Sequence, residues 1–387
     1  MFVRPTPTGS GAYELGQFDF RVRFRREPLQ PLRDRTDPSA GKQMAGDPSC
    51  RPLNWRGDVH RRRGSIIGTV TSLFRAMLAV AVLIVSQPAA ARAREGRIAL
   101  TFDDLPALTI LNDQAYVDYL NVMILRGLKR HHFPATGFVN GGKLDELNRD
   151  RQIANLKRWL DAGMDLGNHT FSHESPNTLG AKAYIADIIR GEPATADLLR
   201  SHGQRLRWFR HPYLETGFPM SVKRTIDGWL SGHGYRIAPV TVDADDWEFA
   251  EPYDDAIARK DVARQRRIKA EYLAYTARRI EWSIRSGRVL FGRDIAQVML
   301  LHCTRLNADS IDDLASLFRR FRLRPVSLDR AMRDPAYRTP DTVAEKEGMD
   351  WLERWAAVKH KDLPEEGDDD PPADIQAAYD RVDNDRH

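Results

Sequence analysis

The feature that most constrains the fold is a regular alternation of short apolar runs and longer amphipathic stretches between residues 97 and 328. Parallel strands joined by helical crossovers have this pattern. The expected strands are 98–102, 135–139, 164–168, 206–209, 236–242, 295–301 and 325–328, and the expected helices are 114–130, 153–162, 184–199, 222–230, 255–285 and 311–321. We therefore predict an α/β fold, either a barrel or a doubly wound sheet. The number of units, about seven, favours a barrel slightly smaller than the eightfold type.

The first 93 residues are expected to be a leader and not part of this fold. Residues 1–65 mix Arg, Pro, Gly and Asp without periodicity, which predicts a disordered segment or one that is not translated because the true start lies after Met1. Residues 66–93 follow three arginines, contain an apolar core from Met77 to Val85 and end in small residues at Ala93. These are the parts of a secretory signal peptide, so we expect export to the periplasm or the exterior, with an uncleaved membrane anchor as the alternative.

The remaining chain is expected to divide into a catalytic domain at 94–335 and a C-terminal part at 336–387. The second part is predicted to contain a helix followed, after Lys361, by a disordered tail, because Glu365–Pro372 is acidic and contains proline.

The charge distribution argues against a nucleic-acid partner. The whole chain has a formal net charge of +5, but residues 1–65 carry thirteen Arg and Lys against seven Asp and Glu, and residues 66–93 add two Arg without an acid. Residues 94–387 therefore have a net charge of −3. A basic surface for nucleic acid is not expected on the folded part.

The two cysteines suggest no metal knuckle and no required disulfide. Cys50 lies in the expected leader, and Cys303 follows a strand, where a buried free thiol is the more common role.

Polar residues that carry chemistry gather at the ends of the expected strands. In parallel α/β folds the carboxyl ends of the strands converge on one face, where active sites form. Each residue alone has a structural explanation, such as a helix cap, a surface ion pair or a core histidine, but their occurrence at five different strand ends favours one shared site. The residues are Asp103, Asp104, His169, Arg210, Asp246, Trp247 and His302.

Two motifs together predict a metal centre. In His169-Thr170-Phe171-Ser172-His173 the two imidazoles are four residues apart, so that on a turn of helix they can face one ion. The adjacent Asp103 and Asp104 end another strand, where one carboxylate can bind the ion and the other can act as a base. Two His and one carboxylate form a common catalytic site for zinc and related metals.

Three further segments complete the candidate site. Pro212 restricts the backbone before Tyr213, so the Tyr213 amide can face a developing oxyanion, beside the fixed cation of Arg210. His302 can act as a general acid if a carboxylate of the segment 243–247 lies nearby and orients it.

Taken in order, five motifs resemble carbohydrate esterase family 4, the NodB-homology polysaccharide deacetylases. They are TFDD at 101–104, HTFSH at 169–173, RHPY at 210–213, DADDW at 243–247 and VMLLH at 298–302, and the resemblance covers roughly 97–330. It implies a deformed (β/α) barrel of about seven parallel strands and one divalent metal, usually Zn²⁺, although Co²⁺ or another divalent ion is compatible.

The resemblance also implies a role for each site residue. It makes Asp104, His169 and His173 the metal ligands, Asp103 the base that Arg210 holds in place, and His302 the acid that Asp246 orients. Tyr213 would contribute its amide, and Trp247 and Leu300 would form the wall of the acetyl pocket. The chain departs from the family pattern at Leu105 and Leu214, where the family commonly has Gly, and in a longer segment between Trp247 and His302.

The expected function is therefore removal of N-acetyl groups from a glycan of N-acetylglucosamine-type units. An O-acetyl esterase acting on xylan-type glycans, or a non-catalytic glycan-binding module, are the alternatives. The expected partner is an acetylated glycan, without nucleic acid and without stable membrane insertion after signal cleavage.

Overall fold

A computed structural model of the chain describes residues 95–367 and 369–383, all within one compact unit, 87–387. The predicted leader at 1–65 and signal peptide at 66–93 lie outside the described residues. None of the helices in the described part is both long and apolar enough to cross a bilayer.

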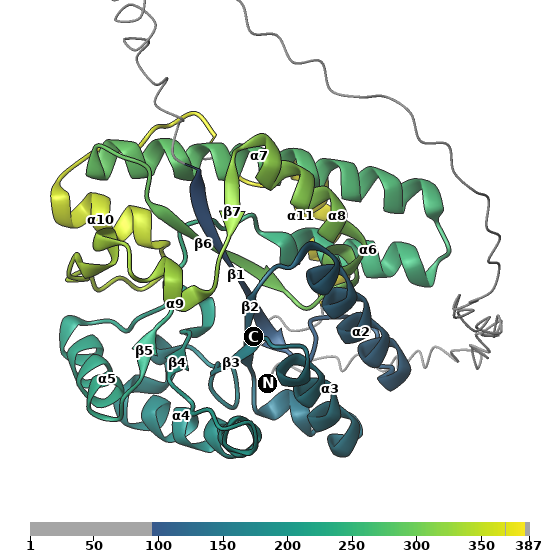
Figure 1. Cartoon of the computed structure of the whole chain (residues 1–387), viewed down its shortest axis with the longest axis horizontal. Coiled ribbons are helices and arrows are strands. Elements are labelled where there is room, and N and C mark those ends of the chain that lie inside the picture. The colour runs from purple at the N-terminus through teal and green to yellow at the C-terminus, as the bar shows by residue number, and fades with distance from the viewer. Residues whose placement is uncertain (1–94, 368, 384–387) are drawn as a thin grey trace, which may run out of the picture. The chain divides into compact units, whose positions relative to one another are not determined.

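Seven parallel strands form one sheet, as the alternation in the sequence predicts (Figure 1). The order of neighbours is β5-β4-β3-β2-β1-β6, and β7 pairs with the first residues of β1. The strands are β1 (Gly96–Leu105), β2 (Ala135–Val139), β3 (Asp165–Asn168), β4 (Trp208–Phe209), β5 (Arg236–Ile237), β6 (Ala296–His302) and β7 (Leu323–Pro325).

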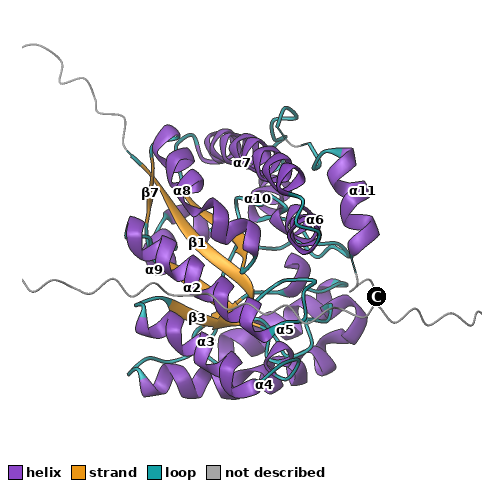
Figure 2. Cartoon of the chain, turned by 90° about the vertical axis from the view of Figure 1, so that its right-hand side faces the viewer, coloured by secondary structure: helices purple, strands orange, loops and turns teal. Residues whose placement is uncertain are grey.

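Helices surround the strands, as Figure 2 shows. They are α2 (Gln114–His131), α3 (Arg149–Asp161), α4 (Pro176–Ser201), α5 (Met220–Gly232), α6 (Asp246–Ala258), α7 (Val262–Phe291), α8 (Arg305–Arg320), α9 (Leu328–Ala331), α10 (Trp351–Lys359) and α11 (Ala373–Val382), with the 3₁₀ turns η1 (Gly142–Leu144), η2 (Pro212–Leu214) and η3 (Pro335–Arg338). The single helix predicted over 255–285 is thus two helices. Asp261 separates them, because its side chain caps α7 by accepting a hydrogen bond from the Arg264 amide.

The predicted strand 236–242 is interrupted after β5, and this interruption lets the sheet close into a deformed barrel. Pro239 follows β5 and has no amide hydrogen to continue the ladder. Thr241 and Val242 then pair with β6 instead, since the Thr241 amide donates to Val298 O at 2.9 Å and the Leu300 amide to Val242 O at 3.0 Å. The first part of the segment, β5, therefore pairs with β4, and its last part, residues 241–242, pairs with β6.

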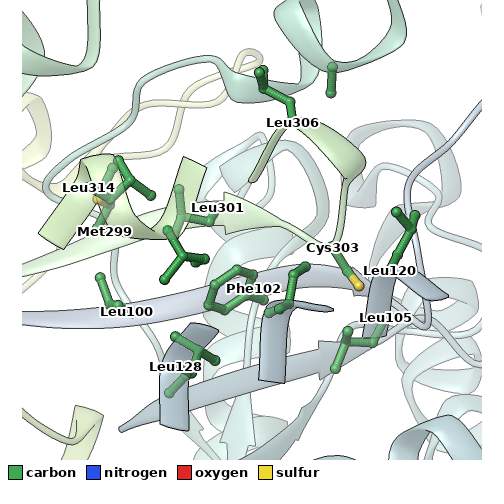
Figure 3. Close-up of a cluster of buried hydrophobic side chains, with 14 of the residues drawn as sticks. Leu100, Phe102, Leu105, Leu120, Leu128, Met299, Leu301, Cys303, Leu306 and Leu314 are labelled. Carbon is green, nitrogen blue, oxygen red and sulfur yellow. The ribbon is translucent and has the colours of Figure 1, made fainter. Parts of the chain in front are cut away.

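The core lies between β1, β6 and the helices that cover them (Figure 3). Phe102 of β1 is fully buried and meets Trp159 of α3 edge to face, with ring centroids 5.4 Å apart. Cys303 is a free, buried thiol in this core, which confirms its predicted role, and burial raises the pKa of the thiol. The apolar packing around β1 and β6 fixes the strand ends that carry the polar residues.

The acidic tail differs from its prediction. Disorder was expected after Lys361, whereas residues 373–382 form helix α11, which packs on α6. Ile375 is fully buried and Tyr379 meets Trp247 edge to face, with ring centroids 4.9 Å apart. The composition of the tail predicts disorder because the tail alone has too few apolar residues to form a core. It folds because Ile375 and Tyr379 pack on apolar surface that the rest of the domain supplies.

Candidate metal and catalytic centre

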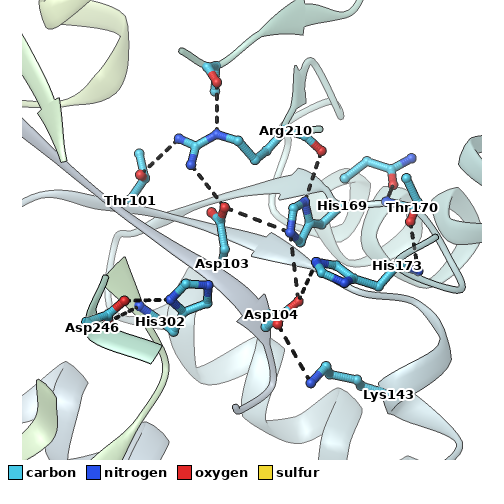
Figure 4. A network of polar contacts seen from close by, with 12 residues as sticks. Thr101, Asp103, Asp104, Lys143, His169, Thr170, His173, Arg210, Asp246 and His302 are labelled. Atoms are coloured by element: carbon cyan, nitrogen blue, oxygen red, sulfur yellow. Dashed lines mark hydrogen bonds and ion pairs between the residues drawn. The ribbon is translucent and has the colours of Figure 1, made fainter. Parts of the chain in front are cut away.

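Both carboxylates of the Asp103–Asp104 pair face the end of the barrel where the strands end, here called the mouth, because β1 ends irregularly. The register with β2 shifts between Phe102 and Leu105, and Asp104 has φ 58° in the left-handed region. In a regular strand these neighbours would point to opposite faces. The bend turns Asp104 toward the loop after β3, while Asp103 remains paired with β6 (Figure 4).

The loop that follows β3 carries His169 and His173, but it is not a turn of helix as the spacing suggested. Thr170 and His173 have positive φ values, 65° and 59°, so the chain curls tightly instead. Asp187 of α4 holds the curl by accepting hydrogen bonds from the amides of Phe171 and Ser172 at 3.1 and 2.9 Å. The imidazoles still converge, with ring centroids 4.9 Å apart.

Asp104, His169 and His173 present ligand atoms that all lie within 4.8 Å of one another. Asp104 Oδ1 lies 3.8 Å from His169 Nε2 and 3.5 Å from His173 Nε2. His169 Nδ1 donates to the carbonyl of Arg210 at 2.9 Å, since a carbonyl can only accept. This bond fixes the tautomer that leaves a lone pair on Nε2, as a metal-binding histidine requires.

The electrostatics of these three residues suit a divalent cation. Burial lowers the pKa of both His169 and His173 to about 4, so both imidazoles are neutral near pH 7. Burial raises the pKa of Asp104, but His173, Lys143 and His169 outweigh it and hold that pKa low. Among the described residues no donor hydrogen-bonds to Asp104 Oδ1, which is buried. A buried, ionised oxygen of this kind beside two neutral imidazoles fits Zn²⁺ or a similar ion.

Arg210 fixes Asp103 from below the mouth. Its Nη1 lies 3.0 Å from Asp103 Oδ2, and the fully buried guanidinium also donates to Thr101 Oγ1 at 3.0 Å and to Ala238 O at 2.8 Å. Burial raises the pKa of Asp103, and the charge of Arg210 opposes this effect. Asp103 is therefore held in one orientation, with a higher proton affinity than an exposed carboxylate.

His302 and Asp246 form a second buried acid–base pair. His302 Nδ1 lies 2.7 Å from Asp246 Oδ1, and the His302 amide donates to Asp246 Oδ2 at 2.7 Å. Asn307 of α8 also donates to Asp246 Oδ2 and to His302 O. Burial lowers the pKa of His302, but Asp246 outweighs it and raises that pKa to about 9.

The remaining predicted residues, Tyr213, Leu300 and Trp247, contact different parts of the structure. The ring of Tyr213 meets that of His173 at 4.6 Å between centroids, so Tyr213 borders the candidate metal site. Leu300 packs with Leu214 and Val240. Trp247 lies in the first turn of α6 against Tyr379 of α11.

Sequence reasoning missed Lys143, Thr101 and Asn307. Lys143 lies in η1 directly after β2, and its Nζ is 3.8 Å from Asp104 Oδ2. The rule that strand ends converge would have found it, because it lies four residues after Val139, the last residue of β2. Thr101 and Asn307 gave no such signal, since their bonds depend on neighbours distant in the chain.

Together the features define an α/β barrel protein with a candidate two-histidine, one-carboxylate metal centre and two acid–base residues at its mouth. The family model for polysaccharide deacetylase matches residues 90–227. Over this stretch the chain is thus similar to polysaccharide deacetylases, in agreement with the resemblance of its motifs to carbohydrate esterase family 4. Asp246 and His302 lie beyond the stretch that this model matches.

Two curated relatives are similar to the chain. A chitin deacetylase of Colletotrichum lindemuthianum is 29% identical over 157 residues, 41% of this chain and 55% of that protein. A peptidoglycan-N-acetylglucosamine deacetylase of Bacillus cereus is 29% identical over 154 residues, 40% of this chain and 47% of that protein. The chain thus spans about half the length of each relative.

Among the solved structures that the chain resembles is a polysaccharide deacetylase from Bacillus cereus, 17% identical with a TM-score of 0.43 over 60% of this chain and 91% of that one. A family 4 carbohydrate esterase from Streptomyces lividans is 21% identical, with a TM-score of 0.38 over 61% of this chain and 95% of that one.

Proposed function

We propose that this protein is a metal-dependent hydrolase that removes N-acetyl groups from a polysaccharide or oligosaccharide of N-acetylglucosamine-type units. The observation that carries the proposal is the convergence of His169 and His173 on Asp104 Oδ1, a buried oxygen that receives no hydrogen bond from the described residues. The names of the two curated relatives support the N-acetyl substrate.

Asp104, His169 and His173 would hold the ion, most suitably Zn²⁺, with Co²⁺ or another divalent ion as alternatives. When bound, such an ion acts as a Lewis acid that acidifies water and polarises an acyl oxygen. The protein contributes the orientation of the three ligands, with His169 fixed through its bond to the Arg210 carbonyl.

In the proposed reaction Asp103 is the base. It accepts a proton from the attacking water as the oxygen of that water bonds to the acetyl carbon. Its raised pKa, which burial causes, improves it as a proton acceptor, and the bond to Arg210 keeps Oδ2 in place. The Tyr213 amide would donate to the oxyanion that forms on the carbonyl oxygen.

His302 is the proposed acid for the second step. It donates a proton to the sugar nitrogen as the carbon–nitrogen bond breaks, which gives acetate and a free amine. A pKa of about 9 keeps it protonated at neutral pH, and Asp246 fixes the ring. Leu300 and Trp247 are proposed to contact the acetyl group, Leu300 from the cluster it forms with Val240 and Leu214.

The test is acetate release from N-acetylglucosamine oligomers and peptidoglycan fragments. We expect release by the metal-loaded protein, its loss after chelation and its return after Zn²⁺ is added. Steady turnover after complete metal removal would overturn the proposal.

Two outcomes of the same screen correspond to other functions. Release from acetylated xylan, but not from N-acetylglucosamine oligomers, would identify an O-acetyl esterase. Glycan binding without acetate release from any substrate would identify a binding module, against which the intact Asp103 and His302 argue.

We further propose that the catalytic domain is exported through the segment 66–93. Fractionation of cells that produce the full chain, with N-terminal sequencing of the exported product, tests this proposal. An N-terminus near residue 94 is expected, and retention of the uncut chain in the membrane would favour an anchor.

A further inference from the structure

The loop that carries the Tyr213 amide has an unusual backbone. Tyr213 and Leu214 are adjacent non-glycine residues with positive φ values, 55° and 56°. L side chains rarely adopt this left-handed conformation, and it persists only where the surroundings enforce it. Leu214 also stands where the resemblance leads one to expect Gly, the residue that adopts it freely. Something in this chain must therefore hold the loop.

Arg354 of α10 is the side chain that reaches the loop. It is fully buried, and its Nη2 donates to the carbonyl oxygen of Leu214 at 3.1 Å. Its other nitrogens donate to Met349 O at 3.2 Å and to Val343 O at 3.3 Å. One guanidinium thus ties the loop of the candidate site to the segment 341–354, which lies outside the stretch that the family model matches.

Two backbone contacts bring the same segment against the loop. Gly348 lies so close that a Cβ added to it would come within 1.7 Å of Tyr213 O. The Trp351 amide donates to Val240 O at 2.8 Å, and Val240 packs with Leu214 and Leu300 in one cluster. Segment 341–354 therefore covers the back of the loop and joins the barrel wall beside it.

Asp341 balances the buried charge of Arg354 and provides an internal control. Its Oδ2 lies 3.4 Å from Arg354 Nη1 and 2.9 Å from Nζ of Lys223 in α5. Lys223 is also buried, and it has a second carboxylate neighbour, Asp227, at 3.0 Å. Both cations pair with Asp341, but the hydrogen bond to the Leu214 carbonyl comes from Arg354.

We propose that residues 341–354 are a positioning element for the catalytic loop, in which Arg354 holds Leu214 in the left-handed conformation and so directs the Tyr213 amide toward the oxyanion. Arg354 is a positioning residue, because it acts through Leu214 and does not contact the reacting atoms. The catalytic part of this inference rests on the proposed function.

The test compares Arg354→Met with Lys223→Met in the metal-loaded, full-length protein. Each variant removes one buried cation from Asp341, so both are expected to unfold at a lower temperature. Only Arg354→Met should lower kcat for acetate release, by roughly 10- to 100-fold, with KM changed by less than about 3-fold, since an oxyanion donor acts mainly in the transition state. Equal kcat values for the two folded variants would overturn the proposal.

A second comparison separates positioning from general damage. Gly adopts the left-handed conformation without help, so the Arg354→Met loss in kcat should be at least about 3-fold smaller in a Leu214→Gly background than in the wild type. Leu214→Gly alone is the reference for the double variant. The same fold loss in both backgrounds would contradict the role assigned to Arg354.

Hydrogen exchange gives a readout that does not depend on activity. The amides of Leu214 and Glu215 donate to His211 O at 3.2 Å and to Pro212 O at 3.1 Å. Both should exchange faster in Arg354→Met than in Lys223→Met. If the wild type releases no acetate, the proposed function fails, but this exchange still decides whether Arg354 holds the loop. If the wild type is active and exchange is equal in the two variants, only the positioning role fails.

Discussion

Asp103 and His302 are paired residues of two neighbouring parallel strands: Asp103 of β1 lies opposite His302 of β6 in the register of the sheet. The proposed base and the proposed acid are thus placed by backbone pairing, not by loops. Each also has its own buried partner of opposite charge, Arg210 for Asp103 and Asp246 for His302. The proposed base and the proposed acid are therefore held in place before any substrate binds.

The first prediction concerns the candidate metal ligand Asp104. Asp104→Asn keeps the shape of the side chain but removes the negative charge that two neutral imidazoles cannot replace. We expect the affinity for Zn²⁺ to fall by roughly 100-fold or more. Metal titration of the chelated protein measures this directly. Asp312→Asn, an exposed carboxylate on α8, is the matched control and should bind as the wild type does.

A second prediction tests the packing behind the histidine loop. In Gly191→Ala the new Cβ would lie 2.6 Å from the backbone oxygen of Thr170, so the loop between His169 and His173 must shift. We expect Zn²⁺ affinity to fall by about 10-fold and stability to fall as well. In Gly228→Ala, on helix α5, the added methyl meets nothing within 4 Å and should stabilise the helix by about 0.5–1 kcal/mol. Equal effects of the two changes on metal affinity would contradict the role given to the Gly191 contact.

A third prediction follows from the acid–base pair. His302 is protonated below its raised pKa of about 9, so the step that needs its proton is supported at neutral pH and lost as the pH rises through about 9. Asp246→Asn removes the carboxylate that raises this pKa, and burial then lowers it. The alkaline limb of kcat/KM should move down by at least about one pH unit. Asp313→Asn, at a half-exposed position on α8, should leave the limb in place.

A fourth prediction concerns helix α11. Ile375 is fully buried where α11 packs on α6. Ile375→Ala should therefore lower the free energy of local unfolding of α11 by about 2–4 kcal/mol. Hydrogen exchange of the amides of 376–382 is the measurement. Ile189→Ala, at a half-exposed position on α4, makes the same change in side chain and should leave these amides unaffected. Unchanged exchange of 376–382 in Ile375→Ala would show that the packing of α11 on α6 does not depend on Ile375.

The order and type of the elements, and the residues that gather at the strand ends, could be predicted from the sequence. Alternation of apolar runs with amphipathic stretches reports local structure, and parallel strands necessarily bring their carboxyl ends to one face. Asp103, Asp104, His169 and His302 were therefore placed at one mouth from sequence alone. The histidine loop, the split of 255–285 into two helices and the helix at 373–382 were not, because capping, close contacts and distant apolar partners decide each of them.

The sequence by itself determined which chemical groups the five motifs bring to the site, since the identity and order of these residues are read directly from the chain. Only the tertiary structure decided how these groups are held. Asp104 turns toward the histidines through a positive φ at a shifted strand end, Asp246 meets His302 across 56 positions, and Arg354 reaches Leu214 across 140. Such contacts depend on which surfaces pack together, and no local pattern of residues records that.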